Sequence, residues 1–437
     1  MRTSIISIQK LQSIKAMLFN PSSWRTYSLF VTEIGSAGLL FLTTVVLTRF
    51  LGKDDFGVFA FYLRFTAFLQ LFFRLGLFYG ASLLLPQEKD PQQARQIVGA
   101  SLLIGLGVGV AFSLSVFIFS FWVDQLFNVK IGVLLRIISP GLILLPMQSL
   151  VRQIDRGLGI VSNILIINLV PQLSYLILVY IAYLAGFLTV ELSVIGNVVT
   201  IALSCFYIFF RYRPSFINLK LSMKKMIQKS KSYGIYAYFV ELTDQATSSL
   251  SSILIPLFAT TTDLGFYTLA LGLVMPITKM SYSIGMVQFK QLALKPSIPK
   301  RILVINYLWL IISCSAVYLL TDWLVVTLFG PEYQPVAQLK ELIVGVAFFT
   351  GAYQIYTFFL TAHEKRFVSY ISIILFPLNL AGNYLLISVY KTEGAMVYQL
   401  WRALIFFVVI LAYYIWIVKN KKVQNDSSPI SELPYEN

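Results

Sequence analysis

The segment Arg211–Tyr233, RYRPSFINLKLSMKKMIQKSKSY, lies at the middle of the 437-residue chain and decides its fold. It contains seven basic residues and no acidic one, whereas the sequence on either side is almost entirely apolar. Loops rich in Lys and Arg stay on the cytoplasmic side of a membrane, because their transfer across it is disfavoured. The segment therefore predicts a cytoplasmic linker between two membrane-embedded halves.

The composition of the chain is that of an integral membrane protein. Hydrophobic residues make up 57% of it and charged residues only 12%, whereas a soluble chain has roughly 25% charged residues. The net charge of +15 does not indicate nucleic-acid binding, because the basic residues lie between long apolar runs, where they set orientation and contact anionic headgroups. Cys205 and Cys314 fall within apolar runs, and a single histidine, His363, excludes a multi-histidine metal site.

The apolar runs predict an all-α polytopic membrane protein with about 12 transmembrane helices in two six-helix lobes, since each run has the roughly 20 residues that a span needs. The weakest span, 131–151, is interrupted by Arg136, Pro140 and Pro146. The expected segments are an N-terminal segment (1–26), an N-terminal lobe (27–210), the basic linker (211–234), a C-terminal lobe (235–418) and a polar tail (419–437).

The distribution of Lys and Arg predicts that both termini are cytoplasmic. Residues 1–26 fit either a short interfacial helix or a partly ordered tail, and 419–437 is expected to be disordered. With this topology, Ser230 and Thr261 face opposite sides of the membrane.

The two halves contain a weak repeat in the same register. Asp55–Phe59 (DFGVF) follows the first span, and Asp263–Tyr267 (DLGFY) follows the seventh, 208 positions later. Glu33 and Glu241 are related by the same offset. Because six is an even number of spans, both copies enter from the same side, which predicts lobes related by a pseudo-two-fold axis along the bilayer normal with a site between them.

Two motifs carry a resemblance to a known family. They are Leu47–Gly52 (LTRFLG), which runs into Asp55–Phe59, and Leu328–Tyr333 (LFGPEY) after the ninth span. With the twelve-span arrangement they resemble polysaccharide-unit (Wzx-type) flippases of the multidrug/oligosaccharidyl-lipid/polysaccharide exporter superfamily. The resemblance covers nearly the whole chain, and its motifs do not indicate which glycan is carried.

The resemblance implies an alternating-access transporter of the bacterial plasma (inner) membrane, not an enzyme. Its substrate would be a polyprenyl-pyrophosphate-linked oligosaccharide that moves from the cytoplasmic to the outer leaflet for cell-surface polysaccharide synthesis. The implied partners are membrane lipid, that lipid-linked glycan, a polysaccharide polymerase and glycosyltransferases. No cofactor is implied, and the sequence has no GxxxxGK[ST] nucleotide-binding motif.

Charged residues inside the predicted spans are the candidate site residues, because a charge at bilayer depth is costly unless it is paired or faces water. Five are basic, and we expect them to form a cationic cavity that binds pyrophosphate. They are Arg64, Arg74, Arg136, Lys279 and Arg402. Arg64 is also long enough to reach the headgroups, and Arg74 has an alternative role as the partner of Glu33.

Two helices carry polar stripes. In the second span Tyr62, Thr66, Gln70 and Arg74 are spaced by four, which predicts a face turned towards a cavity or another helix. In the seventh span the stripe holds Glu241, Asp244, Gln245, Ser248 and Ser252. Together with Glu33, its carboxylates would bind a coupling proton or Na⁺, or balance the charge of the cavity.

Two other functions fit the same sequence. A cation-coupled exporter of drugs or small molecules would share the fold, but it should have a mainly acidic and aromatic cavity. An integral membrane enzyme of glycan assembly is the third candidate, with Asp54 and Asp55 as its acidic pair. That pair belongs to the repeated Asp-x-Gly motif, which favours a structural role.

Overall fold

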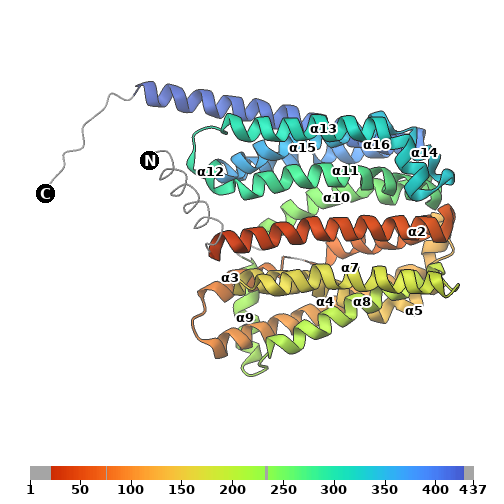
Figure 1. The fold of residues 1–437 in the computed structure, drawn as a ribbon. Coiled ribbons are helices and arrows are strands. Elements are labelled where there is room, and N and C mark those ends of the chain that lie inside the picture. Colours follow the sequence, from red (N-terminus) through yellow and green to blue (C-terminus); the bar gives the residue numbers. More distant parts are fainter. Residues whose placement is uncertain (1–20, 75, 232–234, 428–437) are drawn as a thin grey trace, which may run out of the picture.

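A computed structural model describes residues 21–74, 76–231 and 235–427, and this part of the chain consists of helices and their connections. Nine of the described helices are long and apolar enough to cross a membrane. They run nearly parallel in two groups, one below the other in Figure 1. The all-helical, membrane-type architecture expected from the composition is therefore confirmed.

The first group comes from the N-terminal half and lies in the lower part of Figure 1. Its helices are α2 (Pro21–Phe73), α3 (Tyr79–Leu84), η1 (Leu85–Gln87), α4 (Pro91–Phe127), α5 (Gly132–Leu142), α6 (Leu144–Leu158), α7 (Val161–Leu184), α8 (Val190–Tyr212) and α9 (Leu219–Lys229). Helix α2 packs on α7 of its own group and on α10 and α11 of the other, so it lies at the boundary between the groups.

The second group lies in the upper part of Figure 1. It contains α10 (Ile235–Phe258), α11 (Thr261–Val287), α12 (Phe289–Leu294), α13 (Lys300–Leu324), η3 (Val325–Phe329), η4 (Pro331–Tyr333), α14 (Gln334–Ala337), α15 (Lys340–His363) and α16 (Lys365–Ser427). In Figure 1 the helices α5 and α14 lie at one end of the molecule, and α3, α9 and α12 lie at the other. We name these the α14 end and the α9 end.

Helix α2 is a hairpin that reverses at Gly52, where the backbone leaves the helical region (φ 76°, ψ 169°). On one arm Phe50 stacks on Tyr183 of α7. On the other arm Phe59 stacks on Tyr175, about two turns back along α7. The second arm therefore runs back beside the first, and a positive φ of this kind is one that Gly adopts without a steric cost.

Helix α16 is a second hairpin, which reverses at Lys391 (φ 50°, ψ −123°). A Cβ atom built on Gly394 would collide with the carbonyl of Leu386, and one built on Gly382 would lie 3.8 Å from the Tyr398 ring. Residues so far apart on one continuous helix could not touch. The apolar runs 368–389 and 394–418 predict two separate spans, and the boundary between them falls at this turn.

The interrupted run at 131–151 forms two helices, α5 and α6, which meet at Ile143. The break agrees with the prolines at 140 and 146, each of which removes a backbone donor. Here α4 approaches closely, because a Cβ on Gly109 would meet the Ile143 carbonyl. The break between α5 and α6 is therefore covered by a neighbouring helix.

The basic segment contains a helix, α9, that the sequence analysis treated only as linker. It packs across α3 and α4 at one end of the first group. Met226 is 1% exposed and lies 3.1 Å from Ser101 Oγ, while Lys220, Lys224 and Lys225 are exposed. The apolar side of α9 therefore closes the end of the bundle and its basic side faces outward.

The expectation of disorder from Lys419 is wrong for the first nine residues of the tail, since α16 continues to Ser427. Of the expected N-terminal segment, residues 1–20 lie outside the described part of the chain. Residues 21–26 belong to the start of α2. The side-chain contacts of residues 21–26 likewise lie outside the described part of the structure.

The membrane topology can be tested by labelling one exposed residue at the α9 end and one at the α14 end. Ser230 is 1% exposed and donates to the Leu77 carbonyl, so it is a poor labelling position. Lys224 and Gln338 are exposed, at the α9 end and the α14 end respectively. In a background lacking the two buried cysteines, an impermeant thiol reagent on intact cells should label Gln338→Cys and spare Lys224→Cys.

Inverted vesicles should give the opposite pattern. Labelling of both positions from the same side would contradict the membrane crossings placed between α9 and α14.

Candidate functional site

A cavity of about 680 Å³ lies between the two groups of helices. Both arms of α2, together with α6, α7 and α8, form most of its wall, and α11 contributes the second group's side. Small-molecule sites typically have volumes of about 300–1,000 Å³. The cavity therefore has the size of a small-molecule binding site.

Two arginines line this cavity, Arg64 on α2 and Arg152 on α6. Arg152 Nη1 donates to Asn168 Oδ1 at 3.3 Å, which ties the guanidinium to α7. Among the lining residues that the structure describes there is no Asp or Glu. The described wall therefore carries positive charge only.

The rest of the polar wall is neutral. Tyr62, Thr66 and Gln70 line the cavity, as predicted for this stripe of the second span, whereas its fourth member, Arg74, is not among the lining residues. The Tyr62 hydroxyl donates to Asn197 Oδ1 of α8 at 3.3 Å. Five carboxamide side chains share the wall: Gln70, Gln148, Asn168, Gln172 and Asn197. The cavity therefore combines two cations with groups that both donate and accept hydrogen bonds.

The structure does not bring the other four predicted cations into this cavity. Arg136 bonds to the carbonyl of Gly132 at 3.3 Å and lies 4.7 Å from the ring of Phe121, a residue that is 51% exposed. Its guanidinium therefore packs on the outside of α4. The positions of the spans in the sequence could not predict where Arg136 packs, because the direction of its side chain depends on the rotation of α5 about the helix axis.

The remaining three cations lie elsewhere, each half-buried. Lys279 on α11 lies 5.7 Å from the ring of Tyr282, and Arg402 on α16 lies 5.6 Å from the ring of Phe406. Arg74 follows the end of α2 at the α9 end, where its carbonyl accepts from Leu77.

The predicted acidic residues fall outside the described side chains. Glu33 lies on α2, and Glu241 and Asp244 lie on α10. The same stripe of α10 continues with Gln245 and Ser248, which are half-buried, and Ser252, which is 1% exposed. Their expected part in coupling stays a prediction.

Contacts between the two groups close the α14 end of the cavity. Arg49 Nε donates to the carbonyl of Leu328 at 2.9 Å, and its Nη2 donates to the carbonyl of Thr327. Thr262 donates to Asp54 at 2.6 Å, and Tyr333 donates to the Thr48 carbonyl at 3.3 Å. The two motifs that carry the family resemblance therefore lie against each other.

The glycines of the repeated Asp-x-Gly motif also meet at this end. A Cβ on Gly57 would collide with the carbonyl of Thr261, and a Cβ on Gly265 would lie 3.4 Å from the Gly57 Cα. Gly57 therefore needs to be Gly, because the backbone of α11 approaches it too closely for a side chain. At Gly265 an added Cβ would lie in tight contact with Phe56 and Gly57, without a collision against the backbone.

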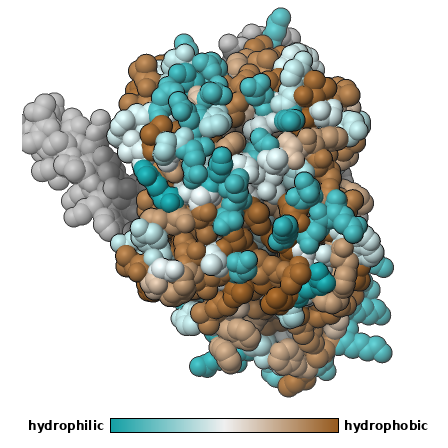
Figure 2. Space-filling view, turned by 90° about the vertical axis from the view of Figure 1, so that its right-hand side faces the viewer, coloured by the Kyte–Doolittle hydropathy of each residue, from teal (hydrophilic) through white to brown (hydrophobic). Residues whose placement is uncertain are grey.

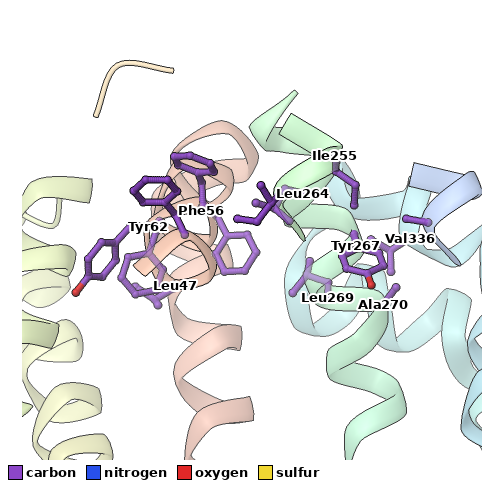
Figure 3. Close-up of a cluster of buried hydrophobic side chains, with 14 of the residues drawn as sticks. Leu47, Phe56, Tyr62, Ile255, Leu264, Tyr267, Leu269, Ala270 and Val336 are labelled. Carbon is purple, nitrogen blue, oxygen red and sulfur yellow. The ribbon is translucent and has the colours of Figure 1, made fainter. Parts of the chain in front are cut away.

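Packed apolar side chains complete the closure, as Figure 3 shows for Leu47 and Phe56 on α2 and Leu264 on α11. Leu47, Phe56 and Phe329 are each at most 3% exposed and form the wall of the cavity nearest this end. Figure 2 looks at this end and shows hydrophilic residues spread over its upper and middle parts. These buried apolar side chains therefore lie between the cavity and that face.

Sequence reasoning missed Arg152 and most of the carboxamides, although the signal was present. On α7, Asn168, Gln172 and Tyr175 follow one another at helical spacing in an apolar run, and on α6 Gln148 and Arg152 are four apart. These stripes obey the rule that identified the stripe of the second span. No group of three or more His, Cys, Asp or Glu that could hold a metal occurs among the described residues.

Comparison with known proteins decides the family. The family model described as "Polysaccharide biosynthesis protein" matches residues 25–289, from α2 to the start of α12. The chain belongs to this family. A search of curated protein sequences finds no match.

Several solved structures of transporters share the fold. The inward-facing conformation of a multidrug resistance MATE family transporter of the MOP superfamily has a TM-score of 0.63 and 13% identity, over 92% of this chain and 96% of that one. The MATE transporter VcmN of Vibrio cholerae has a TM-score of 0.61 and 15% identity, over 91% and 97%. A MOP superfamily transporter from Pyrococcus furiosus has a TM-score of 0.55 and 12% identity, over 92% and 98%.

These similarities establish the fold of a MOP superfamily transporter for this member of the polysaccharide biosynthesis family. They confirm the resemblance inferred from the LTRFLG, DFGVF and LFGPEY motifs. At identities this low the similarity concerns the fold alone.

The closure at the α14 end can be tested at Arg49. Charge-assisted hydrogen bonds contribute about 1.5–3 kcal/mol, and the exposure of Arg49 reduces this. Arg49→Ala should therefore destabilise the closed arrangement by about 1–2 kcal/mol, a factor of about 5–30 in population. The measurement is the rate at which a small thiol reagent modifies Thr48→Cys, a position that is 0% exposed.

Arg213→Ala is the matched control, because Arg213 is an exposed arginine on the loop between α8 and α9. It should leave the modification rate unchanged. If Thr48→Cys is modified at the same rate in the Arg49→Ala variant as in the parent, the contacts of Arg49 with the carbonyls do not hold the two groups of helices together.

Proposed function

We propose that this member of the polysaccharide biosynthesis family is a Wzx-type flippase. It carries a polyprenyl-pyrophosphate-linked oligosaccharide from the cytoplasmic to the outer leaflet by alternating access. The polyprenyl chain stays in the lipid while the headgroup enters the cavity between the two groups of helices. The family and the transporter fold support this class of activity.

One observation carries the proposal: the described wall of the cavity holds Arg64 and Arg152 and no carboxylate. A pyrophosphate cannot enter the apolar interior of a membrane unless its charge is compensated. Arg suits this task because its planar guanidinium binds phosphate oxygens through two parallel hydrogen bonds. The neutral carboxamides and hydroxyls around the two arginines can form hydrogen bonds with the sugars attached to the pyrophosphate.

The membrane arrangement proposed is twelve spans in two six-helix lobes. Nine of the described helices qualify as spans. Two of these, α2 and α16, each contain two arms, and α10 (Ile235–Phe258) adds one more, which gives twelve. The basic residues of α9 support a cytoplasmic position for the α9 end. The α14 end then faces outward, and the closed contacts there correspond to a state that receives substrate from the cytoplasm.

Alternating access requires that the contacts at the α14 end break while the α9 end closes. The carboxylates of Glu33, Glu241 and Asp244 are the proposed groups for coupling to a proton or Na⁺, or for balancing cavity charge. A polysaccharide polymerase and the glycosyltransferases that build the repeat unit are the proposed partners. No enzymatic step is assigned to the protein.

The second candidate is export of a small organic compound, since the MATE transporters that share the fold include one described as a multidrug resistance protein. An organic cation needs acidic or aromatic partners in its binding site. The described wall supplies aromatic rings but only positive charge. The arginines therefore favour the anionic lipid-linked substrate.

Neutralising the cavity arginines tests the proposal. Arg64→Gln and Arg152→Gln each remove a charge-assisted contact of about 1.5–3 kcal/mol, so each should slow flipping about tenfold or more. The measurement follows labelled lipid-linked oligosaccharide across inverted membrane vesicles at matched expression.

Arg156→Gln is the control, because Arg156 lies one turn beyond Arg152 on α6 but is exposed and outside the cavity wall. It should retain the parent rate. Normal flipping in an Arg64→Gln, Arg152→Gln double variant would refute the cationic cavity.

A further inference from the structure

The last turn of α6 contains a carboxyl group that is removed from water. Asp155 is 0% exposed, and so are Ile154 beside it and Ile208 of α8, which belong to one apolar cluster. A Cβ atom built on Gly157, in the same turn, would meet the Ala81 carbonyl of α3 at 3.1 Å. Because α3 lies at the α9 end, this turn of α6 also lies at the α9 end, and α3 covers it.

Two side chains from other helices donate hydrogen bonds to Asp155. The hydroxyl of Tyr212, the last residue of α8, donates to Asp155 Oδ1 at 2.7 Å. Asn163, in the first turn of α7, donates to the same oxygen through Nδ2 at 3.0 Å. The carboxyl group of Asp155 therefore joins α6, α7 and α8, but it does so through only one of its two oxygens.

Two buried oxygens beside these bonds have no hydrogen-bond partner. They are Oδ2 of Asp155 and Oδ1 of Asn163, a residue that is 1% exposed. Each is bonded to the same carbon as one of the two atoms that form the 3.0 Å hydrogen bond, so both lie next to that bond. Both are acceptors when the carboxyl group is ionised. The atom that would satisfy them is therefore a hydrogen.

A protonated carboxyl group and a primary carboxamide form two hydrogen bonds with each other. The amide N–H donates to one acid oxygen, and the acid O–H donates to the amide oxygen. The first of these bonds is present between Asn163 and Asp155. A proton on Asp155 Oδ2 supplies the second. An ionised carboxylate would instead place a charge in apolar surroundings, where such groups become neutral.

The basic residues around Asp155 lie at the surface or line the cavity. Arg211 of α8 interacts with Asp155 electrostatically but is exposed, so water screens its charge. On α6 itself Arg156 is exposed and Arg152 lines the cavity, as Arg64 of α2 does. The neighbouring elements add these ionisable residues at this end: Tyr79, Glu88, Lys89, Asp90, Arg95, Cys205 and Tyr212. The neutral acid needs no counter-charge from any of them.

We propose that the folded protein binds a proton at Asp155 and keeps it bound throughout transport. We call Asp155, Asn163 and Tyr212 the α6 proton site. Its three residues belong to helices of the first group, so movement of one group against the other does not require the site to open. It is therefore separate from the coupling role proposed for Glu33, Glu241 and Asp244. Its proton holds three helix ends together.

The bound proton makes the stability of the protein depend on pH. An exposed aspartate releases its proton at about pH 4. Above that pH, unfolding of a protein that holds this proton also releases it. Stability therefore falls as the pH rises, and the unfolding equilibrium constant increases up to about tenfold per pH unit while the folded site stays protonated. Once the folded site ionises, a further rise in pH has no effect through this group.

Infrared spectroscopy of the full-length protein in lipid nanodiscs tests the proposal. At about pH 5.5, where an exposed aspartate is ionised, the parent should show the carbonyl stretch of a protonated carboxyl group that Asp155→Asn lacks. Asn163→Leu should move this band to higher frequency, because the acid loses its partner. Asp124→Asn is the matched control and should leave the band unchanged, since Asp124 Oδ1 accepts from the backbone N–H groups of Ile131 and Gly132.

The melting temperature provides a second measurement. In Asp155→Asn the new amide N–H takes the place of the acid O–H, so this variant should match the parent at about pH 5.5 and melt above it at about pH 8. Asp155→Leu should melt lower than the parent at both pH values, because Tyr212 and Asn163 lose their acceptor. Asp155→Asn should also flip lipid-linked oligosaccharide at the parent rate, since its uncharged side chain replaces an uncharged acid.

Three outcomes would overturn the proposal. Identical carboxyl bands in the parent and Asp155→Asn at about pH 5.5 would show that Asp155 holds no proton. A band that disappears when Na⁺ replaces choline in the buffer would assign the site to a metal ion. Loss of flipping in Asp155→Asn would show that the proton must leave during transport. The proposed function is tested separately, through the arginines of the cavity.

Discussion

The close approach of the backbones at Gly57 and Thr261 is the contact on which the rest of the structure depends. It brings α2 and α11 together at the α14 end, where Arg49 and Tyr333 add hydrogen bonds across the same boundary. Joined at this end, the two groups leave a cavity between α2, α6, α7, α8 and α11. The residues that close the protein are thus separate from the residues that line it.

This division explains why the motifs with the strongest family resemblance are not at the candidate binding site. Leu47–Gly52 and Leu328–Tyr333 contact each other at the closed end. Their residue types are fixed by backbone geometry, since Gly52 and Gly330 have positive φ and Gly57 has no room for a side chain. The cavity carries its chemistry on helix faces, where a few polar residues interrupt apolar runs.

Much of the fold could be predicted because the membrane imposes simple rules. Long apolar runs must be helices, and the prolines of 131–151 predicted the break between α5 and α6. The stripe of Tyr62, Thr66 and Gln70 correctly predicted which face of its helix is turned towards the cavity. The hairpin arms were placed as separate spans, with boundaries at the turns of Gly52 and Lys391.

The site could be predicted only in part, because a charge inside a span indicates a buried or hydrated environment but not which one. Arg64 faces the cavity, while Arg136 packs on an exposed ring of α4. The difference lies in the rotation of each helix, and this is set by neighbours from distant parts of the sequence. Arg152 was overlooked because it lies near the end of its span, where a basic residue has an ordinary explanation in headgroup contact.

The central claim is that the cavity around Arg64 and Arg152 holds the headgroup of a lipid-linked oligosaccharide. The most direct test places a photoreactive group beside the pyrophosphate of that lipid and maps its adducts on the purified, reconstituted protein. The account predicts adducts on α6, α7 and the second arm of α2. Adducts confined to α13, α15 and α16, with none on the helices that carry the two arginines, would contradict it.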